Sequence, residues 1–204
     1  STLMRSSAAS DVYKRQVLKD KEVMKVLSVS VILYITNIVS TNFFSLYVTQ
    51  WLGIESRYLA FFPILNAAVM LIFMIEIQHK LELVKFRIPM WIGLALYAIA
   101  VILLILAPTG SIPFVIVYVF VVAVAGSLVM PRKDALIQLN INAEERARIN
   151  ALIMSFTIAF SSPFGYFAGW LSSIDRRLPF MFSFALFLVA IIIVGRIRDP
   201  EFSK

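Results

Sequence analysis

The chain has 204 residues, of which 60% are hydrophobic and only 15% are charged. This composition excludes a soluble globular domain, because such domains are about half apolar and about a quarter charged. The net charge of +7 does not indicate a nucleic-acid partner, because the Lys and Arg residues lie in short segments between apolar runs instead of forming a water-facing patch. With no cysteine and a single histidine, disulfides and Cys- or His-rich metal sites are excluded, and we expect no cofactor.

The first sixteen residues, STLMRSSAASDVYKRQ, are polar and aperiodic and lack the apolar core of a signal peptide. Their last six residues, DVYKRQ, resemble the translation of a transposase adaptor end used in sequencing libraries. We therefore expect residues 1–16 to be a non-native segment outside the fold, and the chain to be a fragment of a protein that begins upstream. The alternative is a natural disordered tail.

Six apolar segments follow, each near the roughly 20 residues that a helix needs to cross the hydrocarbon core of a bilayer. None of them alternates polar and apolar residues as the strands of a membrane barrel do. We expect an all-α membrane protein, a bundle of six transmembrane helices from residue 17 to residue 204. The predicted spans are about 24–49, 58–78, 88–107, 112–130, 149–171 and 179–196.

The connections between the spans carry the topology signals. The longest runs from Pro131 to Arg146 and is expected to be a loop, in which Asn142 and Glu145 form a capping pair for the fifth helix. The flanks that share a side with the two chain ends hold most of the Lys and Arg residues, whereas the alternate flanks hold only Arg57, Arg176 and Arg177. The positive-inside rule therefore predicts both termini in the cytoplasm, and we expect a bacterial plasma membrane.

The first span carries a polar stripe on one helical face. Its members follow one another at steps of four, three, four and four: Ser30, Tyr34, Asn37, Thr41 and Ser45, with Asn42 beside them. An uncompensated amide in hydrocarbon costs several kcal/mol, so this face must meet protein or water. It lines either a solute cavity, which we favour, or a set of interhelical hydrogen bonds.

The fifth and second spans also carry polar or small residues. In the fifth span, Thr157 and Ser161 continue a polar face, and Gly165 with Gly169 forms a small-xxx-small pair that predicts close helix packing. Asn66 is the lone amide of the second span, and a cavity contact and a packing contact are equally open for it. The third and sixth spans are nearly featureless, and we expect them to face lipid on most sides.

Other polar and aromatic residues lie near the span ends. We expect Glu76 to be interfacial and to pair with Lys80 four residues later. Trp51, Trp91 and Trp170 also lie near predicted span ends, as in an aromatic belt.

Six helices, with both ends inside and lipid-facing third and sixth members, resemble one half of a major facilitator superfamily transporter. The segment from Asn142 to Leu152 resembles the loop before the eleventh helix of that family, and the segments 162–171 and 175–180 resemble that helix and its exit. These segments point to the C-terminal half, and the resemblance covers about residues 17–196. The loop 78–87 keeps the positive charge of the family's loop but lacks its glycines and aspartate, which puts a gating role there in doubt.

The resemblance implies transport of a small solute by alternating access, with a missing N-terminal half of the same polypeptide closing the other side of a midplane cavity. The expected cavity-facing residues are Tyr34, Asn37, Thr41, Asn42, Asn66, Thr157 and Ser161. The expected partners are the lipid bilayer, the solute and the missing half. An enzyme is not expected, because no nucleophile with a nearby base is visible. The alternative is a complete six-helix protein that acts as a homodimer or as a partner subunit.

Overall fold

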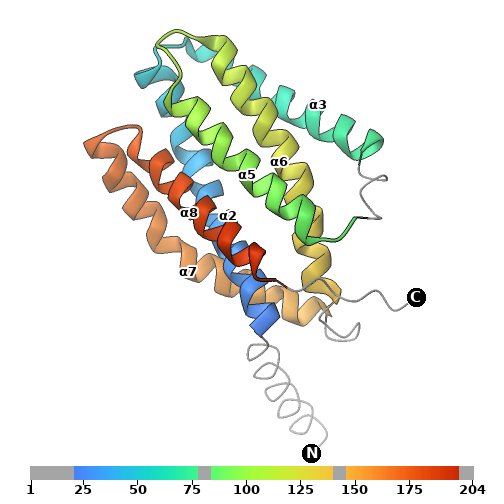
Figure 1. Ribbon diagram of the computed structural model, residues 1–204. Coiled ribbons are helices and arrows are strands. Elements are labelled where there is room, and N and C mark those ends of the chain that lie inside the picture. The colour runs from blue at the N-terminus through green and yellow to red at the C-terminus, as the bar shows by residue number, and fades with distance from the viewer. Residues whose placement is uncertain (1–20, 78–83, 140–145, 198–204) are drawn as a thin grey trace, which may run out of the picture.

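The computed structural model describes residues 21–77, 84–139 and 146–197. Every regular element in these ranges is a helix, which confirms the predicted all-α class (Figure 1). The elements are α2 (Lys21–Leu46), the π-helical turn η1 (Tyr47–Trp51), the 3-10 turn η2 (Ser56–Ala60), α3 (Phe61–Glu76), α5 (Arg87–Ile105), α6 (Ile112–Leu139), α7 (Arg146–Ile174) and α8 (Leu178–Gly195).

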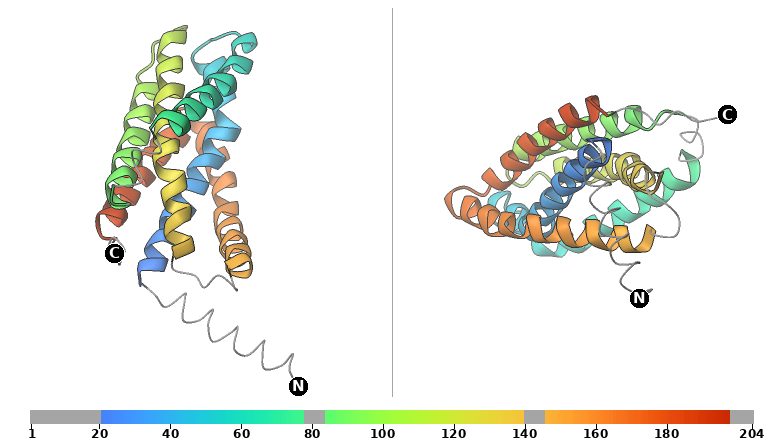
Figure 2. Two further views of the ribbon diagram at one scale, coloured as in Figure 1. Left: turned by 90° about the vertical axis from the view of Figure 1, so that its right-hand side faces the viewer. Right: turned by 90° about the horizontal axis from the view of Figure 1, so that it is seen from below.

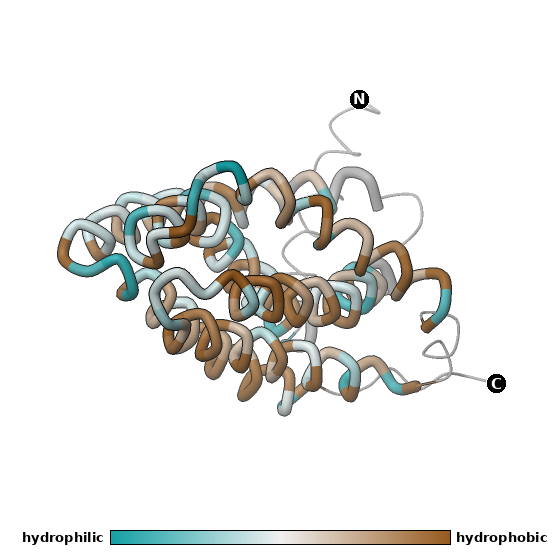
Figure 3. Tube along the Cα trace, turned by 90° about the horizontal axis from the view of Figure 1, so that it is seen from above, coloured by the Kyte–Doolittle hydropathy of each residue, from teal (hydrophilic) through white to brown (hydrophobic). Residues whose placement is uncertain are grey.

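Five spans within the described residues are long and apolar enough to cross a membrane, which supports an integral membrane protein. They are Met24–Trp51, Ser56–Glu76, Arg87–Ile105, Ile112–Ile137 and Leu178–Gly195. The sixth long helix, α7, has 29 residues but is not among these five. Hydrophobic residues colour much of the helical trace in Figure 3.

The predicted spans match the helices to within a few residues, except at the fourth. The prediction of a loop from Pro131 onward is wrong, because α6 continues through Pro131 to Leu139. Proline lacks an N–H and its ring crowds the carbonyl one turn back, so the sequence favoured a helix end there. The capping pair Asn142 and Glu145, the partner Lys80 and the segment 1–16 lie outside the described residues, so those expectations stay predictions.

The helices form three layers, which the right-hand view of Figure 2 shows from below. The helices α5 and α8 pack together on one side, α2 and α6 occupy the middle, and α7 and α3 lie on the other side. Helix α7 packs on α2 and helix α3 packs on α6. Helices α3 and α7 therefore flank one face of α2 and α6.

The packing pattern repeats within the chain. Helix α2 packs on α8 and α7, and helix α6 packs on the counterparts of these two, α5 and α3. If α2, α3 and α5 are exchanged for α6, α7 and α8 in that order, each of these contacts becomes another contact of the same set. The contact of α5 with α8 is unchanged by the exchange. Because the helices alternate in direction, the two three-helix units run in opposite senses (Figure 2, left). Within the described residues, the contact of α7 with α8 has no equally extensive counterpart between α3 and α5.

The prediction that the third and sixth spans face lipid on most sides stays a prediction, because less than half of each spanning window is buried. Helix α5 packs on α6 and α8, and 44% of its spanning window is buried. The second span is the most exposed, with 11% of its window buried. A helix that is apolar all round can bury one face in a protein core as readily as it can face lipid, because composition does not distinguish the two surroundings.

Among the glycines, Gly93 of α5 has the closest neighbours on another helix, which is α6. A Cβ atom on Gly93 would stand 2.5 Å from Val129 Cγ2 and 3.0 Å from the Ala125 carbonyl oxygen. The predicted small-xxx-small pair does face another helix, but it does not make the closest approach. A Cβ on Gly165 would stand 3.7 Å from the nearest atom, on α2, and one on Gly169 would stand 3.9 Å away, which are ordinary van der Waals distances.

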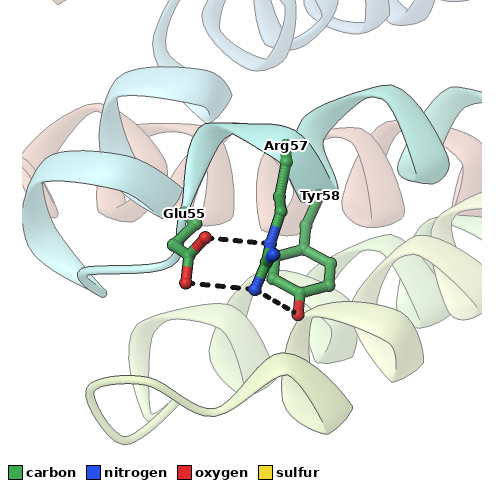
Figure 4. Close-up of polar contacts among 3 residues, drawn as sticks. All are labelled: Glu55, Arg57 and Tyr58. Carbon is green, nitrogen blue, oxygen red and sulfur yellow. Dashed lines mark hydrogen bonds and ion pairs between the residues drawn. The ribbon is translucent and has the colours of Figure 1, made fainter.

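At the end of the bundle opposite to Lys21, short turns connect the helices and are bonded to one another. After Gly53, Arg57 Nε lies 2.8 Å from Glu55 Oε2, and its terminal nitrogen donates to Glu55 and to the Tyr58 hydroxyl (Figure 4). Gly110, in the turn between α5 and α6, has φ of 77° and its N–H donates to the Leu52 carbonyl at 2.6 Å. This bond ties two turns together.

The tryptophans lie near helix ends, in agreement with the predicted belt positions. Trp51 closes η1 and the Arg177 guanidinium lies 4.3 Å from the centre of its ring. Trp91 lies in the second turn of α5, and Trp170 lies in the last turns of α7. Glu76 is the last residue of α3 and is exposed, as expected for an interfacial position.

Candidate functional site

Asn37 lies at the midpoint of the first span, Met24–Trp51, and lines three neighbouring pockets. The other lining residues of these pockets lie on different sides of Asn37 along the bundle. Because this helix is continuous and its polar residues recur at helical spacing, they share the face that α3 and α7 flank. Asn37 is therefore the residue at which the three pockets meet.

The α7-side pocket extends from Asn37 toward the Lys21 end of the bundle. It lies between α2, α6 and α7 and has a volume of about 400 Å³. Its polar lining consists of Ser30, Tyr34, Asn37, Lys133, Asp134, Asn150 and Thr157. The rest of the wall is aliphatic or methionine. The pocket thus combines hydroxyls, amides and one pair of opposite charges with an apolar surface.

The α3-side pocket extends from Asn37 toward the turns at the opposite end. It lies between α2, α3 and α6, and its volume is also about 400 Å³. Its polar lining consists of Asn37, Ser40, Thr41, Ser45, Asn66 and Tyr118. Among the described residues, no charged side chain lines it. The two pockets therefore differ in charge, although both have amide and hydroxyl groups.

A central pocket of only about 50 Å³ lies between the two. It shares Asn37 with both, Leu33 and Met130 with the α7-side pocket, and Ser40 and Tyr118 with the α3-side pocket. The side chains of Tyr118 and Ser40 are hydrogen-bonded to each other. This bond lies where the central pocket and the α3-side pocket share their walls.

Three predicted site residues carry buried polar atoms that have no hydrogen-bond partner in the described structure: Asn66 Oδ1, Thr157 Oγ1 and Ser161 Oγ. Leaving such a group unpaired away from water costs about 1–3 kcal/mol. Thr157 lines the α7-side pocket and Asn66 lines the α3-side pocket, so each unpaired oxygen belongs to a residue of a pocket wall. Ser161 lines none of the three pockets.

The structure brings together most of the predicted cavity residues, but it divides them between pockets. Tyr34 and Thr157 belong to the α7-side pocket, Thr41 and Asn66 belong to the α3-side pocket, and Asn37 belongs to both. Asn42 lines none of the three. Its side-chain nitrogen donates to the Ile38 carbonyl of its own helix at 2.9 Å, so this donor is paired within α2.

Sequence reasoning missed several pocket residues, among them Ser40, Tyr118, Lys133 and Asp134. Ser40 and Tyr118 lie in the narrow middle, and a lone tyrosine in an apolar fourth span was the only available signal for the second. Lys133 and Asp134 were assigned to a loop because Pro131 precedes them. They lie on α6 instead, with Lys133 Nζ 3.0 Å from Asp134 Oδ1.

Comparisons of the chain with protein-family models, with curated proteins and with solved structures each found no match.

Proposed function

We propose that this chain is half of a membrane transporter for a small solute, and that the solute crosses the bundle along the polar face of α2. The observation that carries the proposal is the position of Asn37, at mid-span, where a pocket toward one end of the bundle meets a pocket toward the other. Secondary transporters bind their solutes near the bilayer midplane, between units that rock around the site.

The packing pattern supports this proposal. Two three-helix units of opposite direction, related by an exchange of counterparts, are the arrangement found within each half of a major facilitator superfamily transporter. The sequence resemblance to the C-terminal half of that family points the same way. In this proposal, the other half of the polypeptide covers the face between α3 and α7, and both ends of the chain lie in the cytoplasm of a bacterial cell.

The exposed surface of α3 also favours a second candidate, a complete six-helix protein that pairs with its own copy or with a larger partner. In that case the partner would cover the same face. The two candidates differ in the coding sequence: six further spans upstream in the same frame would support the transporter half, and a start codon just before Val17 would support the small protein.

Cysteine accessibility tests the solute pathway directly, because the chain has no native cysteine. We expect Asn37→Cys and Thr41→Cys, in membranes, to react with a hydrophilic thiol reagent, because water fills a solute pathway. The matched control is Ile102→Cys, an exposed apolar position on α5. Equal reactivity of all three positions would contradict the proposal.

The orientation has its own test. A cysteine at Gly110, in the turn between α5 and α6, should react with an impermeant reagent added outside intact cells, whereas one at Asp134 should not. The reverse pattern would place the termini outside.

Transport itself is tested in the whole protein encoded by the native gene, reconstituted in proteoliposomes. Removing the amide of Asn37 should weaken solute affinity by roughly 5- to 150-fold, since an unpaired buried partner costs about 1–3 kcal/mol. Ile102→Ala is the control. If Asn37→Ala loses activity only in proportion to protein lost from the membrane, the polar face is packing and the pathway lies elsewhere.

A further inference from the structure

The α7-side pocket has a charge arrangement that the α3-side pocket lacks. Two charged side chains line it, Lys133 and Asp134, and they are of opposite sign. The Lys133 side chain is 19% exposed and the Asp134 side chain is 57% exposed. Among the described lining residues, the pocket is therefore neutral overall but strongly dipolar.

Net neutrality selects against a charged solute. A net charge that enters this partly buried pocket, beside the 19% exposed Lys133 side chain, is favoured by a compensating charge. The single lysine and single aspartate already compensate one another, so an added anion or cation would leave one charge unmatched. A solute that carries one charge of each sign can pair with both at once.

The distance between the charges of Lys133 and Asp134 narrows the class of solute further. Lys133 Nζ and Asp134 Oδ1 are 3.0 Å apart, and the ammonium and carboxylate of an α-amino acid are similarly close because a single carbon separates them. When the two charge pairs lie side by side in opposite order, the solute ammonium lies next to the Asp134 carboxylate and the solute carboxylate lies next to the Lys133 ammonium. Each cation and each carboxylate then keeps a charge-assisted hydrogen bond.

The rest of the pocket supplies a polar anchor and an apolar wall. Thr157 is 6% exposed and its hydroxyl has no partner in the described structure, so it is free to donate to a bound carboxylate. Ile137, Ile153 and Ile158 contribute aliphatic surface. This wall suits an aliphatic substituent, because burying apolar surface is favourable.

From these observations we infer that the α7-side pocket binds a small zwitterion with an aliphatic side chain, of the amino-acid type, through Lys133 and Asp134. The inference rests on the proposed function, since it names the class of solute that the same pathway takes.

The test uses the full chain purified in detergent and three leucine probes that differ only in charge: L-leucine, N-acetyl-L-leucine as the anion and L-leucinamide as the cation. Binding is measured by isothermal titration calorimetry. We expect the unmodified chain to bind L-leucine at least about tenfold more tightly than either charged probe, each 1.4 kcal/mol being tenfold.

Two variants that each remove one charge from the pocket should then change which charged probe binds more tightly. Asp134→Asn leaves a net positive pocket and should favour N-acetyl-L-leucine, whereas Lys133→Met leaves a net negative pocket and should favour L-leucinamide. Thr157→Val should weaken the binding of L-leucine. Arg57→Met, which removes a cation at the opposite end of the bundle, is the matched control and should leave the order of the probes unchanged.

Two results would overturn the inference. One is equal or tighter binding of a charged probe by the unmodified chain. The other is no binding of L-leucine by a chain in which Asn37→Cys still reacts with the thiol reagent, which would refute the solute class and leave the pathway standing. An unreactive Asn37→Cys would instead refute the proposed function itself.

Discussion

Replacing Gly93 by alanine should destabilise the bundle at the contact between α5 and α6. The new Cβ would lie 2.5 Å from Val129 Cγ2, 3.0 Å from the Ala125 oxygen and 3.1 Å from Leu128 Cβ. Ordinary carbon contacts are about 3.5–4.0 Å. The Ala125 and Leu128 atoms belong to the backbone or are attached to it directly, so the helices must separate. Overpacking costs about 1–3 kcal/mol, offset in part by about 0.5–1 kcal/mol from replacing glycine within a helix.

We therefore expect a net loss of about 1–2 kcal/mol in the free energy of unfolding. Unfolding of the purified chain by SDS titration, followed by tryptophan fluorescence, measures it. Gly169→Ala is the control, because its Cβ would meet Phe43 Cζ at an ordinary 3.9 Å and should cost nothing. If Gly93→Ala is as stable as Gly169→Ala, the close approach of α5 and α6 is not as described here.

Three further predictions concern the turns at the end opposite to Lys21. Gly110→Ala should lower stability by about 1–2 kcal/mol in the same titration, because an alanine at a positive φ is strained; an unchanged midpoint would contradict it. Arg177→Met should cost about 0.5–1 kcal/mol through the lost cation–π contact and should shift the emission of Trp51; an unchanged spectrum would argue against the contact. Glu55→Gln should change the unfolding midpoint very little, because its pair with Arg57 is exposed.

The positions of the helices were predictable because hydrophobic length is a strong signal in a membrane. The predicted start and end of five spans agree with the helices to within a few residues. The end of α6 was not predictable, because Pro131 normally ends or kinks a helix and charged residues follow it. The helix continues with Arg132 almost fully buried, which depends on neighbouring helices that no local pattern describes.

The candidate site was predictable where it repeats with helical spacing. Tyr34, Asn37 and Thr41 were found because polar residues at steps of three and four stand out in an apolar span. Spacing alone could not show that Asn42, the next residue, bonds to its own helix. It also could not show that Tyr118, from a distant span, bonds to Ser40, since such pairs depend on tertiary contacts.

The partner helices of α2 could not be predicted from composition. Apolar residues in a membrane lose no free energy in exchanging lipid for protein, so the outer and inner faces of α5 look alike in the sequence. Polar residues do discriminate, because lipid offers them no hydrogen bonds. This explains why the polar face was located from the sequence, whereas the order of the layers required the structure.

The cost of placing polar residues against lipid also limits what can cover the polar face of α2. Asn37 and Thr41 are exposed in the described structure, and both lie on the face of α2 between α3 and α7. At mid-span neither side chain can be left to lipid, because an unpaired amide or hydroxyl there would cost about 1–3 kcal/mol even on the scale of protein mutational data. A single packed neighbour would bury them, but it would also fill the two pockets of about 400 Å³ that meet at Asn37. A cover that leaves the pockets open, with water or a solute against the amide, satisfies both observations, and the reactivity of Asn37→Cys distinguishes it from a packed neighbour.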